Sequence, residues 1–109
     1  MTLGELIQWL EAQDKNAIVP EGFSSPHSDR GFYYNLAFTP QPESRIGDML
    51  GHAKGAVGKT FMGYKGGDYY MDLGTEVLIG QYGSCGEEIN LYTLKYWEQQ
   101  IDERKNTTT

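Results

Sequence analysis

The chain has 109 residues, of which 39% are hydrophobic and 22% charged, a composition typical of one compact globular domain and not of a disordered chain. Nine basic and fifteen acidic residues give a formal net charge of -6, which disfavours nonspecific binding to duplex nucleic acid. The sequence has no apolar run of the roughly 18 residues that a membrane span needs and no signal-peptide pattern, so we expect a cytoplasmic protein, and the single cysteine, Cys85, excludes an internal disulfide.

The first predicted element is a helix over residues 3–13. Thr2 and Glu5 have the spacing of a capping box, in which each side chain bonds to the other residue's backbone N–H. Apolar residues then recur at helical spacing, at Leu3, Leu6, Ile7 and Leu10. One face of this helix should therefore pack on the core.

Residues 14–28 contain prolines, glycine and small polar residues, which predict an irregular connection with a short strand at 17–19. A connection of this length also raises the prospect of a functional loop. Residues 32–39 then alternate with period two and predict a strand, which Pro40 and Pro42 should stop. The apolar face of that strand would carry Phe32, Tyr34, Leu36 and Phe38.

A second helix is predicted after Ser44, which has a side chain suited to capping. Its apolar stripe would consist of Ile46, Met49, Leu50, Ala53 and Val57. Strand patterns follow at 60–64, 69–72 and 75–82, with glycine turns between them, and favour an antiparallel meander. A last helix would be capped by Ser84 with Glu87 and would carry Leu91, Leu94, Trp97 and Ile101 on one face.

This order of elements predicts an α+β domain over residues 1–105, followed by a polar flexible C-terminus at 106–109. The sheet should be small, mainly antiparallel and three- to four-stranded, with two to three helices packed against it. Residues 53–60 also fit a relaxed phosphate-loop pattern. A true phosphate loop follows a strand and opens a helix, whereas here the motif ends a predicted helix and enters a strand, so we interpret its glycines as helix-terminating.

Two groups of residues could bind a ligand or a partner. In the first, His27, Ser28 and Arg30 offer hydrogen-bond donors at the end of the long connection, although Asp29 and Arg30 could equally pair with each other or with backbone in a turn. The two histidines, His27 and His52, lack a diagnostic ligand spacing, so we expect no metal site and no cofactor. Three adjacent residues also cannot form a Ser/His/Asp triad, so no catalytic residues are assigned.

The second group is the predicted hairpin tip, consisting of Tyr64, Lys65, Gly66, Gly67, Asp68 and Tyr69, with Tyr33 and Tyr82 nearby. Tyrosine rings could stack on a base or ribose while Lys65 meets a phosphate, which would make a pocket for one small nucleotide. A tight hairpin with tyrosines packed across the sheet is the structural alternative. The eight tyrosines of the chain equally suit a protein interface.

Several of these segments resemble small proteins encoded by tailed bacteriophages. The resemblance spans about residues 3–90 and is carried by Pro26-His27-Ser28, Arg30-Gly31, residues 36–40 and 47–50, and the YKGGDY segment at 64–69. It implies a phage or prophage setting, where small acidic non-enzymatic proteins often block or sequester components of bacterial immunity.

The leading functional hypothesis is accordingly a non-catalytic binding protein that antagonises bacterial immunity. It would act as an anti-CRISPR-like inhibitor of a defence protein, or it would sequester a nucleotide immune signal. A small enzyme acting on a nucleotide, with His27 as acid or base and Asp68 as its partner, is the competing class. A structural or regulatory phage protein that self-associates through its tyrosines is a third.

Overall fold

The computed structural model describes residues 1–107, with side chains described as far as Arg104. The elements in chain order are α1 (Leu3–Ala12), β1 (Ile18–Ser28), β2 (Leu36–Arg45), α2 (Ile46–Ala56), β3 (Thr60–Met62), β4 (Asp68–Tyr70), β5 (Val77–Ile79), β6 (Glu87–Glu88) and α3 (Leu91–Thr107). One sheet has the strand order β1-β2-β5-β6, and β3 with β4 forms a separate hairpin. The fold is α+β, as predicted.

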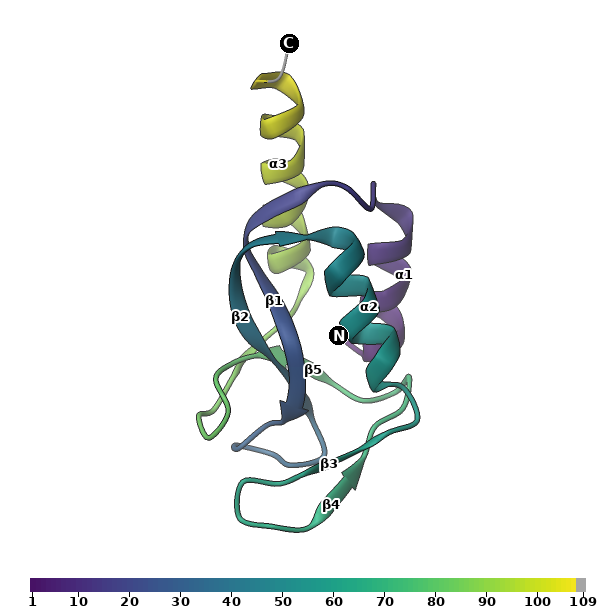
Figure 1. Cartoon of the computed structure of the whole chain (residues 1–109), viewed down its shortest axis with the longest axis vertical. Helices are drawn as coiled ribbons and strands as arrows, with labels where there is room; N and C mark the ends of the chain where they lie inside the picture. Colours follow the sequence, from purple (N-terminus) through teal and green to yellow (C-terminus); the bar gives the residue numbers. More distant parts are fainter. Residues whose placement is uncertain (108–109) are drawn as a thin grey trace.

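The long β1–β2 ribbon organises the molecule (Figure 1). Helices α1 and α2 pack against each other, and α2 and α3 both contact β1. Figure 1 shows α3 extending past one end of the ribbon, while the β3–β4 hairpin lies at the opposite end. Within residues 1–107, every helix is too short or too polar to cross a membrane.

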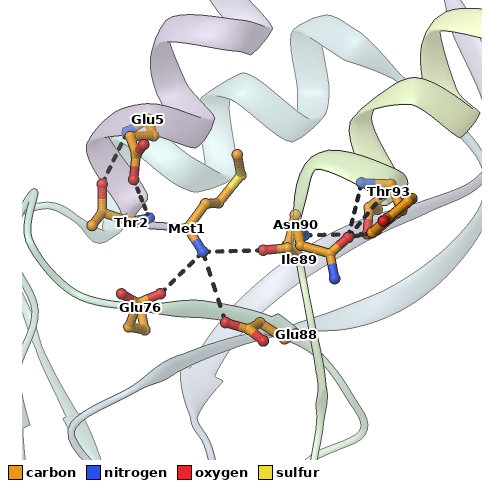
Figure 2. A network of polar contacts seen from close by, with 9 residues as sticks. Met1, Thr2, Glu5, Glu76, Glu88, Ile89, Asn90 and Thr93 are labelled. Carbon is orange, nitrogen blue, oxygen red and sulfur yellow. Dashed lines mark hydrogen bonds and ion pairs between the residues drawn. The ribbon is translucent and has the colours of Figure 1, made fainter.

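The predicted first helix and its capping box are both confirmed. Glu5 N donates to Thr2 Oγ1 and Thr2 N donates to Glu5 Oε1, so the first turn of α1 has its exposed donors satisfied. The amino group of Met1 lies beside the start of α1, 3.1 Å from Glu76 Oε2, and donates to the carbonyl of Ile89 (Figure 2). These contacts join the start of α1 to β5 and to the segment that enters α3.

The predicted irregular connection at 14–28 is wrong, because most of it forms the eleven-residue strand β1. β1 lies at an edge of the sheet, where a proline is tolerated if its missing N–H would not face the neighbouring strand. Pro26 meets this condition: it lies opposite Phe38, whose carbonyl accepts from Gly80 N on the side away from β1. A bulge between Phe23 and Pro26 absorbs the remaining irregularity.

The prediction for residues 32–39 is wrong at both ends. β2 begins at Leu36, so Phe32 and Tyr34 lie in the preceding turn and are exposed, whereas Leu36 and Phe38 are buried as expected. The strand also continues through Pro40 and Pro42 to Arg45. Both prolines occupy positions at which β2 does not donate to β1, so the ladder loses no hydrogen bond.

Helix α2 is present, but its predicted ends are wrong. The hydroxyl of Ser44 donates to Gln41 O within β2, and the N-cap is Arg45, which makes no side-chain capping bond. At the other end Val57 is the exposed C-cap, and Ala56 is the last buried residue. Gly58 follows with φ of 77°, a conformation that favours glycine, so the helix-terminating interpretation of this motif is confirmed.

The predicted hairpin is confirmed, and the predicted meander beyond it is wrong. β3 and β4 pair antiparallel around Gly66 and Gly67, which have φ of 98° and 85°. β5 pairs in parallel with β2 instead of with β4, because a turn stabilised by Asp72 leads the chain away from the hairpin. The backbone of Thr75 then accepts from Leu3 N, which places β5 beside the start of α1.

Helix α3 begins six residues later than the predicted Ser84–Glu87 cap would place it, because residues 87–88 form β6. The capping residue is Asn90, whose Oδ1 accepts from Tyr92 N and Thr93 N. Leu94, Trp97 and Ile101 are buried as predicted, whereas Leu91 is exposed. The helix includes Asn106 and Thr107, and residues 108–109 of the predicted polar tail lie outside the described residues.

Aromatic packing joins α3 to the ribbon and to α1. The ring centroids of Phe23 and Phe38 lie 4.3 Å apart, and Trp97 contacts both Phe23 and Trp9. The indole N–H of Trp97 donates to the carbonyl of Glu21 at 3.0 Å, which satisfies the polar atom of a side chain that is otherwise buried. The edge of β1 and α3 are therefore fixed relative to each other.

Candidate functional site

Three segments far apart in the sequence meet at the hairpin end of the molecule: the turn at 29–35, the β3–β4 turn and the loop at 80–86. Arg30 joins all three, since its guanidinium lies 4.8 Å from the ring centroid of Tyr64 and donates to the carbonyl of Gly83 at 2.8 Å. The structure thus brings together the two groups of candidate residues that the sequence placed on separate segments.

The rings in this region form two chains of contacts. The first joins Phe32 to Tyr34, and Tyr34 and Tyr33 to Tyr69, at centroid distances of 5.0 to 5.8 Å. The second joins Tyr64 to Tyr82 at 5.9 Å, and Tyr82 to the His27 ring at 5.6 Å. We call these rings the aromatic end; it consists of Phe32, Tyr33, Tyr34, Tyr64, Tyr69 and Tyr82.

Much of the aromatic end faces solvent. The exposed fractions are 57% for Phe32, 63% for Tyr34, 47% for Tyr64 and 54% for Tyr82. Tyr69 is half-buried and packs against the hydrophobic core, so the exposed ring of Tyr34 rests on an anchored one. Large aromatic side chains that are both exposed and held in place by contacts are typical of interaction surfaces.

Asp29 holds the turn at 29–35 against the loop at 80–86. Its carboxylate is almost fully buried and accepts from Gly86 N at 2.8 Å and from Phe32 N at 3.1 Å. Neither donor carries a formal charge, and no cation pairs with Asp29 among the side chains that the structure describes. The expected alternative, in which Asp29 and Arg30 bond to backbone in a turn, is therefore confirmed.

His27 and Ser28 bond inward, to backbone carbonyls. The two ring nitrogens of buried His27 lie 2.8 Å from Gly80 O and 3.2 Å from Ser28 O. Ser28 is fully buried, and its hydroxyl donates to Tyr33 O at 2.6 Å. Because these groups are occupied by backbone partners, they order the segment beneath the aromatic end and do not present donors to a ligand at its surface.

Lys65, Gly66, Gly67 and Asp68 lie at the tip of the hairpin. The turn is closed by Gly63 N donating to Gly67 O and Gly66 N donating to Gly63 O. Lys65 and Asp68 are exposed, and within the described part of the chain neither side chain has a hydrogen-bond or ion-pair partner. Lys65 is thus the predicted site residue that remains available to an anionic ligand.

Sequence reasoning underestimated Asp29 and missed the exposure of Phe32 and Tyr34. The alternation of residues 32–38 favoured a strand, whereas the polar segment before it, with Asp29 and Gly31, carried the turn signal that explains their exposure. His52 lies on α2, remote in sequence and in element from this region. Among residues 1–104, no three His, Cys, Asp or Glu side chains gather where they could hold a metal ion.

Comparisons of the chain with protein-family models, with curated proteins and with solved structures give no match.

Proposed function

We propose that this protein is a non-catalytic binding protein whose aromatic end contacts a protein partner. The observation that carries the proposal is the group of exposed rings held by three separate segments. Tyrosine and phenylalanine provide large contact area with few rotatable bonds, so ordering them on binding costs little entropy. Asp29 and Arg30 fix the loops beneath the rings before any partner arrives.

The resemblance to small phage proteins supports a component of bacterial immunity as the partner. An inhibitor of this kind needs only to cover the working surface of a defence protein, and a preformed aromatic surface is suited to that task. The inward bonding of His27 weighs against the competing enzyme hypothesis, because a general acid or base must reach its substrate.

The test is capture of a partner from phage-infected bacteria by the tagged full chain. The interface variant is Tyr34→Ala/Tyr82→Ala, which removes two exposed rings from different segments. The matched control is Leu91→Ala/Tyr92→Ala, which removes two exposed large apolar side chains from α3. We expect wild type and the control to capture the same stoichiometric protein, and the interface variant to lose it by about tenfold or more, the scale of interface hot spots.

A functional readout follows from the same variants. If the captured protein belongs to an immune system, expression of the wild type should restore phage plaques on bacteria that carry that system, and Tyr34→Ala/Tyr82→Ala should not. Equal capture by wild type and the interface variant, with both folded, would contradict the proposed function.

Lys65 is exposed and has no partner among the side chains that the structure describes, which favours a second candidate, sequestration of a small nucleotide. Arg30 already bonds within the protein, so Lys65→Ala is the more selective substitution. A nucleotide released by heating the purified wild type, and absent from Lys65→Ala, would favour this candidate over the protein interface. The matched control is Lys95→Ala, which removes an exposed lysine from α3.

A further inference from the structure

A groove of about 760 Å³ is lined by residues 20–22 of β1, the open edge of β2, the segment at 79–88 and α3. It arises because β5 pairs with β2 only from Leu36 to Phe38, whereas β2 continues to Arg45. Beyond Phe38, the edge of β2 that faces away from β1 therefore has no neighbouring strand within residues 1–107. The groove shares the loop at 80–86 with the candidate site, but none of the six rings that define the aromatic end lines it.

The backbone on the β2 side of the groove presents acceptors without donors. Leu36 N donates to Glu76 O and Phe38 O accepts from Gly80 N, so these residues direct their backbone polar groups away from β1. The register shift of the ribbon falls in β1, so the alternation along β2 continues to Pro40 and Pro42. Their carbonyls face the groove edge, and as prolines they have no N–H beside them.

The charge of the groove is negative and, like its backbone acceptors, favours a ligand that donates hydrogen bonds. Its lining includes Glu21, Glu87 and Glu88, all exposed, and no lysine, arginine or histidine among the side chains described as far as Arg104. Glu88 lies 4.0 Å from the amino group of Met1, whereas Glu21 and Glu87 have no ion-pair partner among the described side chains. At least two carboxylates are thus available to a cation that enters from solvent.

The remaining walls are apolar. Proline rings and Ile79 line one side, and α3 contributes Tyr96, whose side chain is partly exposed. A groove that has apolar walls, carboxylates and unpaired carbonyls suits a side chain with an aliphatic stem and a head that only donates hydrogen bonds. Arginine fits this description, because its guanidinium has five N–H donors, no acceptor and a plane that stacks on tyrosine.

We propose that this groove binds an extended, arginine-bearing segment of another protein. Strand addition would not supply the affinity, since Pro40 and Pro42 remove the N–H groups with which β2 would pair a new strand. Binding instead depends on the arginine heads at Glu21 and Glu87 and on packing of the stems against the prolines and Tyr96. The proposal concerns a different surface from the proposed function and does not depend on it.

The test uses fluorescence anisotropy of the full chain with a labelled peptide of sequence Gly-Ser-Arg-Val-Arg-Ser-Gly. The charge variant is Glu21→Gln/Glu87→Gln. Its matched control is Asp68→Asn/Asp102→Asn, which removes the same net charge at exposed positions outside the groove lining. We expect saturable one-to-one binding that the charge variant weakens by about tenfold or more, while the control stays within about twofold, since only the former loses charge-assisted hydrogen bonds.

Two companion peptides distinguish arginine recognition from general attraction. Replacing both arginines by citrulline keeps the shape but removes the charge and should abolish binding, and replacing them by lysine should weaken it. Tyr96→Ala should also weaken binding, whereas Tyr34→Ala/Tyr82→Ala should leave it unchanged, which separates this groove from the aromatic end.

Three results of the peptide-binding assay would overturn the proposal. They are absence of saturable binding by the arginine peptide, equal weakening by the charge variant and its control, and equal affinity for the lysine peptide. A concentration-dependent dimer of the protein that Glu21→Gln/Glu87→Gln dissociates would also overturn it, because the occupant of the groove would then be a second copy of this chain.

Discussion

The carboxylate of Asp29 provides the most direct test of how the aromatic end is held together. Asp29→Asn keeps the shape of the side chain but replaces one acceptor oxygen by a donor NH₂ group. Only one of the two backbone donors, Gly86 N and Phe32 N, can then keep its partner. The other is left facing a second donor in a site where Asp29 is only 3% exposed.

The expected loss follows from those two bonds. A hydrogen bond to a charged group contributes about 1.5–3 kcal/mol, so losing one and weakening the other should lower the free energy of unfolding by about 2.5 kcal/mol. With a urea m-value of about 1.5 kcal/mol/M, in the range of small proteins, the unfolding midpoint falls by about 1.7 M. Trp9 and Trp97 lie in or against the core and report the transition by fluorescence.

The matched control is Asp68→Asn, the same chemical change at an exposed carboxylate on the hairpin. It should move the midpoint by less than about 0.3 M, as surface substitutions usually do. Hydrogen exchange adds a local readout, because the Gly86 and Phe32 amides should exchange faster in Asp29→Asn. If the two variants unfold at the same midpoint and these amides keep their protection, the carboxylate does not join the two loops.

Three further predictions test other parts of the argument. Gly83→Ala should lower the thermal midpoint more than Gly66→Ala. Both glycines have positive φ, which costs other residues about 1–2 kcal/mol. A Cβ at Gly83 would also lie 3.0 Å from Tyr64 Cε2, whereas a Cβ at Gly66 would face open space. Trp97→Ala should lower the free energy of unfolding in urea by about 3–5 kcal/mol, the range for a buried tryptophan. Tyr92→Ala should lower it by close to nothing, because Tyr92 is 82% exposed, and similar losses for the two variants would contradict the assigned core. The backbone N–H and then the hydroxyl of Thr2 hold the pKa of Glu5 below its ordinary value. The stabilisation that the ionised Glu5 carboxylate gives to α1 is therefore present above the unfolded-state pKa and is lost as pH falls through the folded-state pKa. The difference in thermal midpoint between wild type and Glu5→Gln should shrink from pH 7 to pH 3, and a constant difference would refute this.

Local signals predicted the parts of the fold that local interactions determine. The capping box at Thr2 and Glu5 and the turn at Gly66 and Gly67 each involve residues close together in the sequence, and both are confirmed. The apolar stripe of α3 was also predicted from its spacing. Its start was not, because a second capping-box spacing at 84–87 competed with the Asn90 cap that the structure uses.

The errors concern strands, and they share one cause. Prolines in β1 and β2 indicated loops, yet a proline disrupts a strand only where its N–H would be needed by a neighbour. Whether an N–H is needed depends on which strand lies alongside, and that is a long-range property. For the same reason the parallel pairing of β5 with β2 could not be read from a chain in which β5 follows a hairpin.

The candidate site shows the same division between local and long-range information. The sequence indicated that the segments around Arg30, Lys65 and Tyr82 were polar, aromatic turns suited to binding. It contained no sign that the Arg30 guanidinium would stack on Tyr64 and bond to Gly83. Contacts between segments 34 and 53 residues apart thus give Arg30 a role in ordering the loops that the sequence did not indicate.

The two proposed surfaces differ in their sensitivity to salt, and this difference follows from their composition. Contact through the aromatic end depends on removing rings from water, which added salt does not weaken. Binding in the groove depends on Glu21 and Glu87, and exposed charges are screened over about 10 Å at 0.1 M salt. A partner that uses only the aromatic end should keep its affinity when salt rises. One that also places an arginine segment in the groove should lose affinity with salt, and Glu21→Gln/Glu87→Gln should abolish that dependence while leaving the aromatic contribution in place.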